Sequence, residues 1–246
     1  CITKKTKAIL LVHLYGQIKD MDSWLELTKN NNIDLIEDCA QSHLAAYNGI
    51  TAGNFGIAGA FSFYPTKNLG AYGDAGFIAT NDINISESAK ILRDYGQTAK
   101  YSHDRIGLNS RLDEVQAAIL IQRMEILIKQ TKRRQDIAKA YFDNLSNKKI
   151  KLLKEPESKE SHVFHLFVLL CNNRSELQKY LLDNEIQTNI HYPLPMHNQK
   201  AVTGISHDAN GLGNSELHAN KCLSIPCHPN MTDNEVDKVI DIINNF

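Results

Sequence analysis

Short apolar runs alternate with helical patterns through the first part of the chain, and this alternation constrains the fold more than any other feature. Helical patterns begin at Asp22 and cover Ser86–Tyr95, where we expect Ser86 to cap the helix. Four apolar runs have the length of strands: Ala8–Val12, Ile33–Ile36, Ala58–Phe63 and Gly76–Thr80. Near-continuous apolar strands that alternate with helices indicate an α/β fold with a mostly parallel sheet covered on both faces.

A change in composition predicts the domain organisation. One long helical pattern runs from Ser110 to about Leu145, and Lys, Glu, Ser and Pro then crowd residues 147–161. We therefore expect a large domain at 1–146 and a smaller C-terminal α+β domain at 147–246. The smaller domain has four predicted elements: a strand at His162–Leu170, a helix at Ser175–Asn184, a strand at Leu223–Ile225 and a helix at Thr232–Phe246. The last helix begins with the capping-box pattern of Thr232 and Glu235.

Charge and cysteine content exclude several classes of function. The net charge of the 246 residues is −1, which offers no footprint for nucleic acid or for an anionic membrane surface. No apolar run has the length of a membrane span. The five cysteines form no C-x-x-C pair, so we predict neither a metal site nor a disulfide framework, and we expect the reducing cytosol as the compartment.

A single lysine, Lys67, stands in an apolar stretch flanked by glycines. The stretch Phe61–Gly70 begins at the end of the predicted strand Ala58–Phe63, and glycines precede and follow it. Such surroundings depress the pKa of a lysine and make it a nucleophilic amine, which forms Schiff bases with carbonyl compounds and with pyridoxal phosphate. On this stretch alone, a turn lysine that points to water explains the pattern as well.

Other polar residues lie where such an amine would need partners. Asp38 follows a buried strand at the carboxyl edge of the predicted sheet, where a carboxylate can pair with a protonated ring nitrogen, and Gln41 follows one turn later. Ser62 offers a hydroxyl to a phosphate, and Asn109 precedes the long helix with Ser110 and Arg111. Each also has a plain structural reading: a helix cap for Asp38 and Asn109, and a serine bonded to backbone for Ser62.

Taken together, the order and spacing of these motifs resemble one family. The motifs are Glu37–Gln41, Ser62–Lys67, Gly73–Gly76 and Gly107–Glu114, with further matches at Val12–Gly16, Ile190–His197 and Leu223–Pro226. This combination strongly resembles the DegT/DnrJ/StrS nucleotide-sugar aminotransferases. The resemblance runs from about Ala8 to the C-terminus and implies the aspartate-aminotransferase fold with pyridoxal 5′-phosphate as cofactor.

The resemblance also implies roles for individual residues. Lys67 looks like the lysine that holds the cofactor and moves the proton, and Asp38 looks like the partner of its ring nitrogen. Gln41 resembles the residue against the ring, and Ser62 a phosphate ligand. Asn109 resembles the asparagine that reaches the cofactor of a neighbouring subunit, which implies a homodimer with shared active sites. Three more residues stand where the family brings substrate contacts, although a proline-braced structural loop explains them equally well: His191, Tyr192 and His197.

The chain departs from the family pattern at its beginning. Family members carry a long N-terminal segment before the strand that starts this chain, and Cys1 leads almost directly into that strand. We therefore expect an N-terminally truncated chain whose large domain is partial.

The activity implied is a ping-pong transamination for polysaccharide or O-antigen sugars. L-glutamate would donate the amino group, and a nucleotide-linked keto-deoxysugar would accept it, with C3 of a dTDP-3-keto-6-deoxyhexose favoured by the resemblance of Lys67–Gly76 to C3-acting members. The alternatives are a C4 aminotransferase on a UDP- or dTDP-4-keto sugar and a non-catalytic family member or remnant. A dehydratase is disfavoured, because relatives of that kind replace the lysine with histidine.

Overall fold

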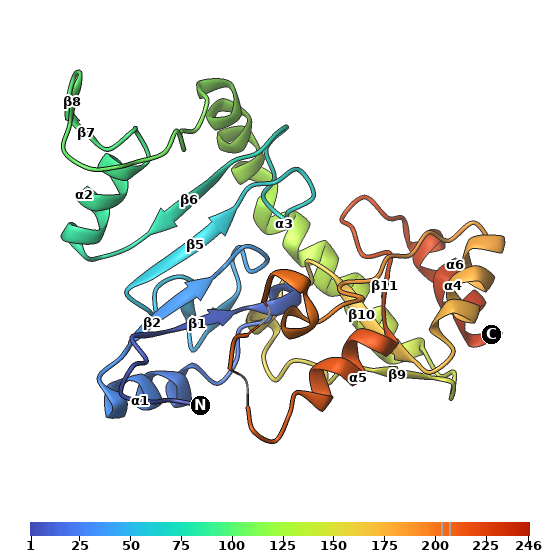
Figure 1. Cartoon of the computed structure of the whole chain (residues 1–246). Helices are drawn as coiled ribbons and strands as arrows, with labels where there is room; N and C mark the ends of the chain where they lie inside the picture. Colours follow the sequence, from blue (N-terminus) through green and yellow to red (C-terminus); the bar gives the residue numbers. More distant parts are fainter. Residues whose placement is uncertain (203, 207) are drawn as a thin grey trace. The chain divides into compact units, whose positions relative to one another are not determined.

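The computed structural model describes residues 1–202, 204–206 and 208–246, which form two compact units (Figure 1). The first, which we call the sheet unit, consists of Lys5–Lys132 and Ser158–His165. The second, the C-terminal unit, consists of Cys1–Lys4, Arg133–Glu157 and Leu166–Phe246. The predicted domain boundary between residues 146 and 147 stays a prediction, because the two compact units have their boundaries at other residues.

A four-stranded sheet with the order β1-β2-β5-β6 forms the centre of the sheet unit (Figure 1). The three parallel strands are β1 (Ala8–Val12), β2 (Asp34–Asp38) and β5 (Ala58–Ser62), and β6 (Gly76–Ala79) is antiparallel to β5. All four predicted strands are therefore present, and the mostly parallel sheet of the α/β prediction is confirmed.

Helix α1 (Met21–Asn31) connects β1 to β2 and buries one end on the sheet. Met21 is fully buried and packs in a cluster with Ile18, Leu35 and Cys39. The helix ends where Asn32 adopts a left-handed backbone conformation, which asparagine tolerates better than most residues. This cluster fixes the turn after β1 against β2, the strand that ends at Asp38.

Helix α2 (Ile83–Leu92) begins earlier than predicted. Asp82, not Ser86, is the cap: its Oδ1 accepts hydrogen bonds from the backbone N–H groups of Asn84 (2.7 Å) and Ile85 (3.3 Å). A carboxylate at this position satisfies two donors that the first turn leaves open, so the helix starts three residues before the serine.

Helix α3 (Glu114–Asn144) is the long predicted helix, with its start four residues later than expected. Its residues up to Lys132 belong to the sheet unit and the later ones to the C-terminal unit. Within the sheet unit, Leu120 and Leu127 pack against Phe63, Leu69 and Ala71. The first half of α3 therefore supports the segment that carries Lys67.

The C-terminal unit is a three-stranded antiparallel sheet with helices, as the α+β prediction requires. The sheet has the order β11-β10-β9, and the helix α6 begins with the predicted capping box of Thr232 and Glu235. The elements are β9 (Ile150–Leu152), β10 (Phe167–Cys171), α4 (Arg174–Asp183), α5 (Gly213–Lys221), β11 (Cys222–Ile225) and α6 (Asp233–Asn244).

The predicted strand at His162–Leu170 is wrong in its first half. Residues 162–165 belong to the sheet unit, where Phe164 has a left-handed backbone (φ 44°) that no regular strand contains. Residues 162–165 are all buried, so the pattern there reflects burial of the segment and not a ladder of strand hydrogen bonds. The helix predicted to begin at Ser175 begins one residue earlier, at Arg174, and its N-cap residue Asn173 makes no side-chain cap bond.

Short elements complete the described chain. Hairpins and single turns of 3₁₀ helix connect the main elements, and none of the described helices combines the length and apolar composition that crossing a bilayer requires. These elements are β3 (Ala46–Tyr47), β4 (Ile50–Thr51), β7 (Gln97–Ala99), β8 (Ser102–His103), η1 (Leu14–Gly16), η2 (Lys159–Ser161), η3 (Met196–Asn198) and η4 (Lys200–Val202).

Candidate active site

Lys67 lies in a tight turn directly after β5. Its backbone N–H donates to the Tyr64 carbonyl (2.9 Å), and the Ala71 N–H closes the loop on the Phe63 carbonyl (2.7 Å). Gly70 makes this turn possible, because a Cβ there would lie 2.6 Å from the Pro65 carbonyl oxygen. The turn therefore presents Lys67 from a fixed backbone.

The surroundings of Lys67 agree with the predicted nucleophilic amine. The side chain is half-buried. Burial lowers the pKa of the Lys67 ammonium below its usual value, and the charge of Asp38 offsets part of this effect. A half-buried lysine with a lowered pKa carries more neutral amine at neutral pH, which is the form that attacks a carbonyl carbon.

Asp38 is the last residue of β2, in the middle of the parallel strands. It pairs in register with Val12 of β1 and Ala60 of β5, so its carboxylate lies at the carboxyl edge of the sheet. One carboxylate oxygen, Oδ1, accepts a hydrogen bond from the Ala40 N–H (3.0 Å). The helix cap that we held open for Asp38 is not present, because no helix lies among the described residues between β2 and β3 and this bond closes a turn, which occupies one of the carboxylate oxygens.

Gln41 lies in the turn after β2 and is buried. Its Oε1 accepts a hydrogen bond from the Tyr15 N–H (2.6 Å), which ties the turn after β1 to the turn after β2. The predicted contact of Gln41 with a cofactor ring stays a prediction.

Ser62 is the last residue of β5 and is half-buried. It pairs with Gly76 of β6, and its Oγ accepts from the Tyr64 N–H at the long distance of 3.3 Å. The hydroxyl proton is not used in that bond, so the Ser62 O–H can still donate a hydrogen bond to an anion.

His43 is a neighbour of this group that we did not predict. Its buried ring packs against Phe61 (centroids 5.5 Å apart) and Phe63 (5.7 Å). Burial and the charge of Lys67 lower the pKa of His43 to about 4, against a smaller opposite effect of the Ser62 backbone. His43 is therefore neutral at pH 7. Its position two residues after Gln41 was the one available signal, and a single histidine is too common to carry it.

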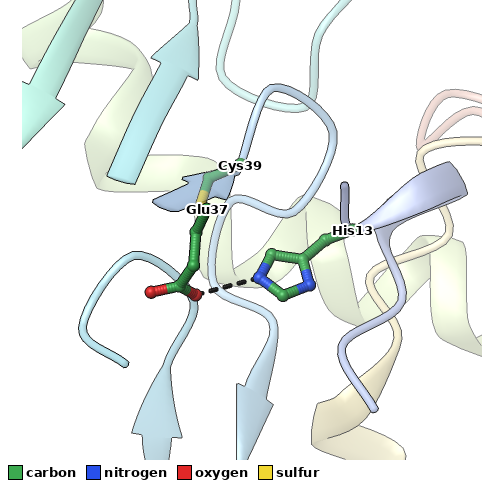
Figure 2. Close-up of side chains that lie close together, drawn as sticks. All are labelled: His13, Glu37 and Cys39. Atoms are coloured by element: carbon green, nitrogen blue, oxygen red, sulfur yellow. Dashed lines mark hydrogen bonds and ion pairs between the residues drawn. The ribbon is translucent and has the colours of Figure 1, made fainter. Parts of the chain in front are cut away.

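A second group that we did not predict lies beside Asp38. Figure 2 shows His13, Glu37 and Cys39 together, with the His13 Nε2 donating to Glu37 Oε2 (2.9 Å). Their ligand-type atoms all lie within 4.8 Å of one another. Burial raises the pKa of the Cys39 thiol to about 12, and the charge of Glu37 adds to this effect.

The contacts of Glu37 explain this group without a metal ion. Besides His13, the carboxylate accepts backbone N–H bonds from Gly53 (2.8 Å), Phe55 (2.8 Å) and Gly56 (2.9 Å). Burial would raise the pKa of Glu37, but these hydrogen bonds outweigh it and the pKa is lowered. Four donors use the carboxylate lone pairs, so Glu37 acts as an anchor for the loop at 53–56.

Asn109 lies in the exposed segment before α3. It forms an isolated bridge with Asp94, and its Oδ1 accepts from Arg111 Nε (3.2 Å). No described contact brings Asn109 to Lys67, and its predicted role toward a neighbouring subunit stays a prediction.

The three predicted substrate residues lie in the C-terminal unit. His191 Nδ1 is 2.8 Å from the Ser224 Oγ, and His197 Nε2 is 3.2 Å from Glu216 Oε1. Tyr192 is about half exposed and meets the His191 ring edge-on. These contacts fit the structural reading of the loop, and the substrate roles stay predictions.

Within the sheet unit, the residues present fit the predicted cofactor. Lys67 supplies an amine of lowered pKa, Asp38 a carboxylate at the sheet edge, and Ser62 a free hydroxyl proton. These are the groups that an aldehyde, a basic ring nitrogen and a phosphate require.

Comparison with known proteins gives the family. The model of the DegT/DnrJ/EryC1/StrS aminotransferase family matches residues 1–244. The chain is 44% identical over 245 residues to the dTDP-3-amino-3,6-dideoxy-alpha-D-galactopyranose transaminase of Aneurinibacillus thermoaerophilus, covering 100% of this chain and 67% of that protein. It is 39% identical over 247 residues to a "pleiotropic regulatory protein" of Geobacillus stearothermophilus, covering 100% and 66%.

A solved structure agrees with these matches. The crystal structure of S. venezuelae DesV in complex with a ketimine intermediate is similar with a TM-score of 0.92 and 39% identity, over 99% of this chain and 66% of that chain. The chain thus spans about two thirds of the length of these relatives. By sequence and by fold, it belongs to the DegT/DnrJ/EryC1/StrS aminotransferase family.

Proposed function

We propose that the protein is an aminotransferase that moves an amino group from L-glutamate to a nucleotide-linked keto-deoxysugar, at C3 of a dTDP-3-keto-6-deoxyhexose. The observation that carries this proposal is the pair formed by Lys67 and Asp38. A half-buried amine with a lowered pKa follows one parallel strand, and a carboxylate that acts on its pKa ends the neighbouring strand. Membership in the family supports the same reading.

The family depends on pyridoxal phosphate, and four side chains of the sheet unit would hold it. Lys67 would bind its aldehyde carbon, Asp38 its ring nitrogen and Ser62 its phosphate, while Gln41 would lie against its ring. When bound, the group draws electrons from the carbon that carries the amine.

Lys67 is the residue that would move the proton. A lysine must be neutral to accept a proton from carbon and charged to return it, so a pKa nearer to neutral pH serves both steps. Burial lowers the pKa of Lys67 in this direction, and Asp38 limits how far it falls. Asp38 would also keep the ring nitrogen protonated, because a carboxylate beside it favours the charged form.

The choice of C3 rests on relatives. The similar protein of A. thermoaerophilus is named as a transaminase that forms a dTDP-3-amino sugar. The alternative is a C4 aminotransferase on a UDP- or dTDP-4-keto sugar. A panel of keto-sugars that differ only in the position of the carbonyl distinguishes the two.

A homodimer with shared active sites is part of this proposal. Beside Asn109, the apolar side chains of Ile106 and Leu108 are 99% and 73% exposed. Apolar side chains gathered on a surface favour a protein partner, and a second copy would bring Asn109 toward its cofactor. The cytosol is the compartment that we propose, because the cysteine pattern predicts no disulfide framework.

Absorbance spectra of the purified protein with pyridoxal phosphate test the proposal. We expect the absorbance band of a protein-bound Schiff base to appear, and to be lost on addition of L-glutamate. Lys67→Ala should abolish the band and all turnover with keto-sugars, whereas Lys90→Ala, at an exposed lysine of α2, should change neither. Turnover retained by Lys67→Ala would overturn the role of Lys67.

A second candidate is a regulatory family member without turnover. The similarity to the Geobacillus protein, named for regulation, favours it. In that case the spectrum would show cofactor binding, but no keto-sugar of the panel would gain an amine.

A further inference from the structure

The segment 158–165, which we call the strap, returns to the sheet unit after the chain has left it. Its backbone bonds to the turn after β1: Val163 N–H donates to the Gly16 carbonyl (3.0 Å), and the Ser161 carbonyl accepts from Ile18 N–H (2.9 Å). An isolated bridge joins His162 to Gln17. The strap is thus fixed along the turn that holds Tyr15 and Gly16.

Gly16 lets the strap approach this turn closely. A Cβ at Gly16 would lie 2.7 Å from the Gln41 carbonyl oxygen, 2.8 Å from Val163 Cγ2 and 3.2 Å from the His165 N. Its φ of +96° also favours glycine. Because Tyr15 N–H donates to Gln41, the strap, this turn and the turn after β2 form one connected group.

Asn68, the residue after Lys67, joins the same group from the other side. It is 5% exposed, and both ends of its amide are used. Its Nδ2 donates to the Val163 carbonyl (3.1 Å), and its Oδ1 lies 3.2 Å from His165 Nδ1. Since a carbonyl can only accept, the amide orientation is settled and His165 Nδ1 must donate to Asn68.

We propose that Asn68 and His165 are positioning residues for Lys67: they fix its position relative to the turn that carries Gln41. The inference rests on the proposed function of Lys67. The two hydrogen bonds fix the residue next to the lysine to a segment that also fixes Gly16 and, through Tyr15, Gln41. A displacement of about 1 Å at a reacting group can cost about 100-fold in rate, so such a tie matters for chemistry.

The test measures how fast Lys67 captures pyridoxal phosphate. Purified protein is mixed with pyridoxal phosphate, reduced with borohydride at set times and digested, and the modified Lys67 peptide is quantified. Melting temperature is measured in parallel, so that a loss of stability is seen separately. We expect Asn68→Ala and His165→Leu to slow capture by about tenfold or more, on the scale of a small displacement of the amine.

Two conservative variants separate positioning from packing. In His165→Asn, the side-chain NH₂ can replace the Nδ1 donor, and we expect capture near the original rate. In Asn68→Asp, the acceptor for His165 stays, but an oxygen faces the Val163 carbonyl, and we expect slow capture. Glu160→Gln is the control, because it changes another bond of the strap, from Gly49 N–H, without touching Asn68.

Each outcome has a separate meaning. If the unmodified protein does not capture pyridoxal phosphate at Lys67, the proposed function fails. If it does, and Asn68→Ala and His165→Leu capture at its rate, or slow only as Glu160→Gln does for the same loss of melting temperature, the positioning role is wrong. Slow capture in Asn68→Ala, His165→Leu and Asn68→Asp together with recovery in His165→Asn supports it.

Discussion

At the scale of single residues, the charges around Lys67 are few and opposed. Burial lowers the pKa of Lys67, the Asp38 carboxylate raises it, and His43 is held neutral by its own burial. The amine therefore responds mainly to Asp38, and a change of that one charge should be visible both in titration and in rate.

Asp38→Asn keeps the size of the side chain and removes the charge. Because the charge of Asp38 raises the pKa of Lys67, the variant should titrate Lys67 at lower pH, seen as a downward shift in the pH midpoint of capture. Loss of the charge that stabilises the cofactor ring should also reduce turnover by about 100-fold or more. Asp34→Asn, at the exposed start of the same strand, is the control. An upward shift, or a rate within twofold of the original, would contradict the assignment.

Glu37→Gln should destabilise the fold by about 3 kcal/mol, because an amide NH₂ cannot accept the bonds that the carboxylate accepts. The pKa of Glu37 is lower in the folded protein than the usual 4.5. Its stabilisation is therefore present above pH 4.5 and is lost as the pH falls toward the folded-state pKa. Urea unfolding at several pH values measures both effects, and Glu26→Gln on the exposed face of α1 is the control. Equal unfolding midpoints for Glu37→Gln and the original protein would refute the anchor role.

At the scale of elements, side-chain pattern predicted where strands and helices lie better than where they begin. The four strands of the sheet unit are as expected, since continuous apolar runs of that length have few other uses. The start of α2 was missed because a cap depends on which side chain reaches the first N–H groups, and Asp82 reaches them before Ser86. Residues 162–165 of the strap were mistaken for the start of a strand, because this part of the strap is buried without a break, as a core strand is.

The candidate site divides in the same way. Asp38 and Lys67 each follow a predicted strand, and these two strands pair in parallel, so the charge interaction between the two residues could be expected from topology. The bond of His13 to Glu37 joins residues 24 apart, and that of Asn68 to His165 joins residues 97 apart. Such pairs form only in the packed structure, so no short-range sequence pattern predicts them.

Thr232→Ala tests the cap of α6, whose capping box was predicted from the sequence. The Thr232 Oγ1 accepts from Glu235 N–H, and the Glu235 carboxylate accepts from Thr232 N–H. Loss of the cap should cost about 1 kcal/mol of stability. Urea unfolding measures this, and Thr232→Ser, which retains the hydroxyl, should stay near the original value. A matching loss in the serine variant would show that packing of the methyl group, and not the cap, is responsible.

At the scale of the whole molecule, acid should weaken the fold. Burial lowers the pKa of His43 to about 4 and that of His162 to about 3, from the usual 6.5. Below pH 6.5 these histidines bind protons in the unfolded chain but stay neutral in the folded protein. Their contribution to stability is therefore full above pH 6.5 and is lost as the pH drops toward 4. At pH 5 each of these histidines should cost about 2 kcal/mol relative to pH 7.

His43→Phe should reduce that loss by the share of one histidine. The new ring can pack between the same two phenylalanines and binds no proton. The change in unfolding free energy between pH 7 and pH 5, measured for both proteins in urea, decides the point. An identical change in both would place the titration of His43 near its ordinary value.

Mixing two inactive variants tests the proposed shared site. Lys67→Ala and Asn109→Ala place their defects in different subunits of a hybrid dimer, so one site of each hybrid is intact. Equal mixing makes half of the dimers hybrids, and we expect about a quarter of the original turnover. Activity no greater than the sum of the two variants, in a mixture shown by mass spectrometry to contain hybrids, would argue against sharing.

The strap has a consequence for the order of events on the ribosome. The Lys67 turn is synthesised early, but the carbonyl that Asn68 Nδ2 binds comes 95 residues later. At about 5–20 residues per second, several seconds pass before that partner is made. During this interval the four-stranded sheet can form while the Lys67 turn lacks its hydrogen bond to Val163. In the nascent chain, the sheet can therefore form before Lys67 is held in position.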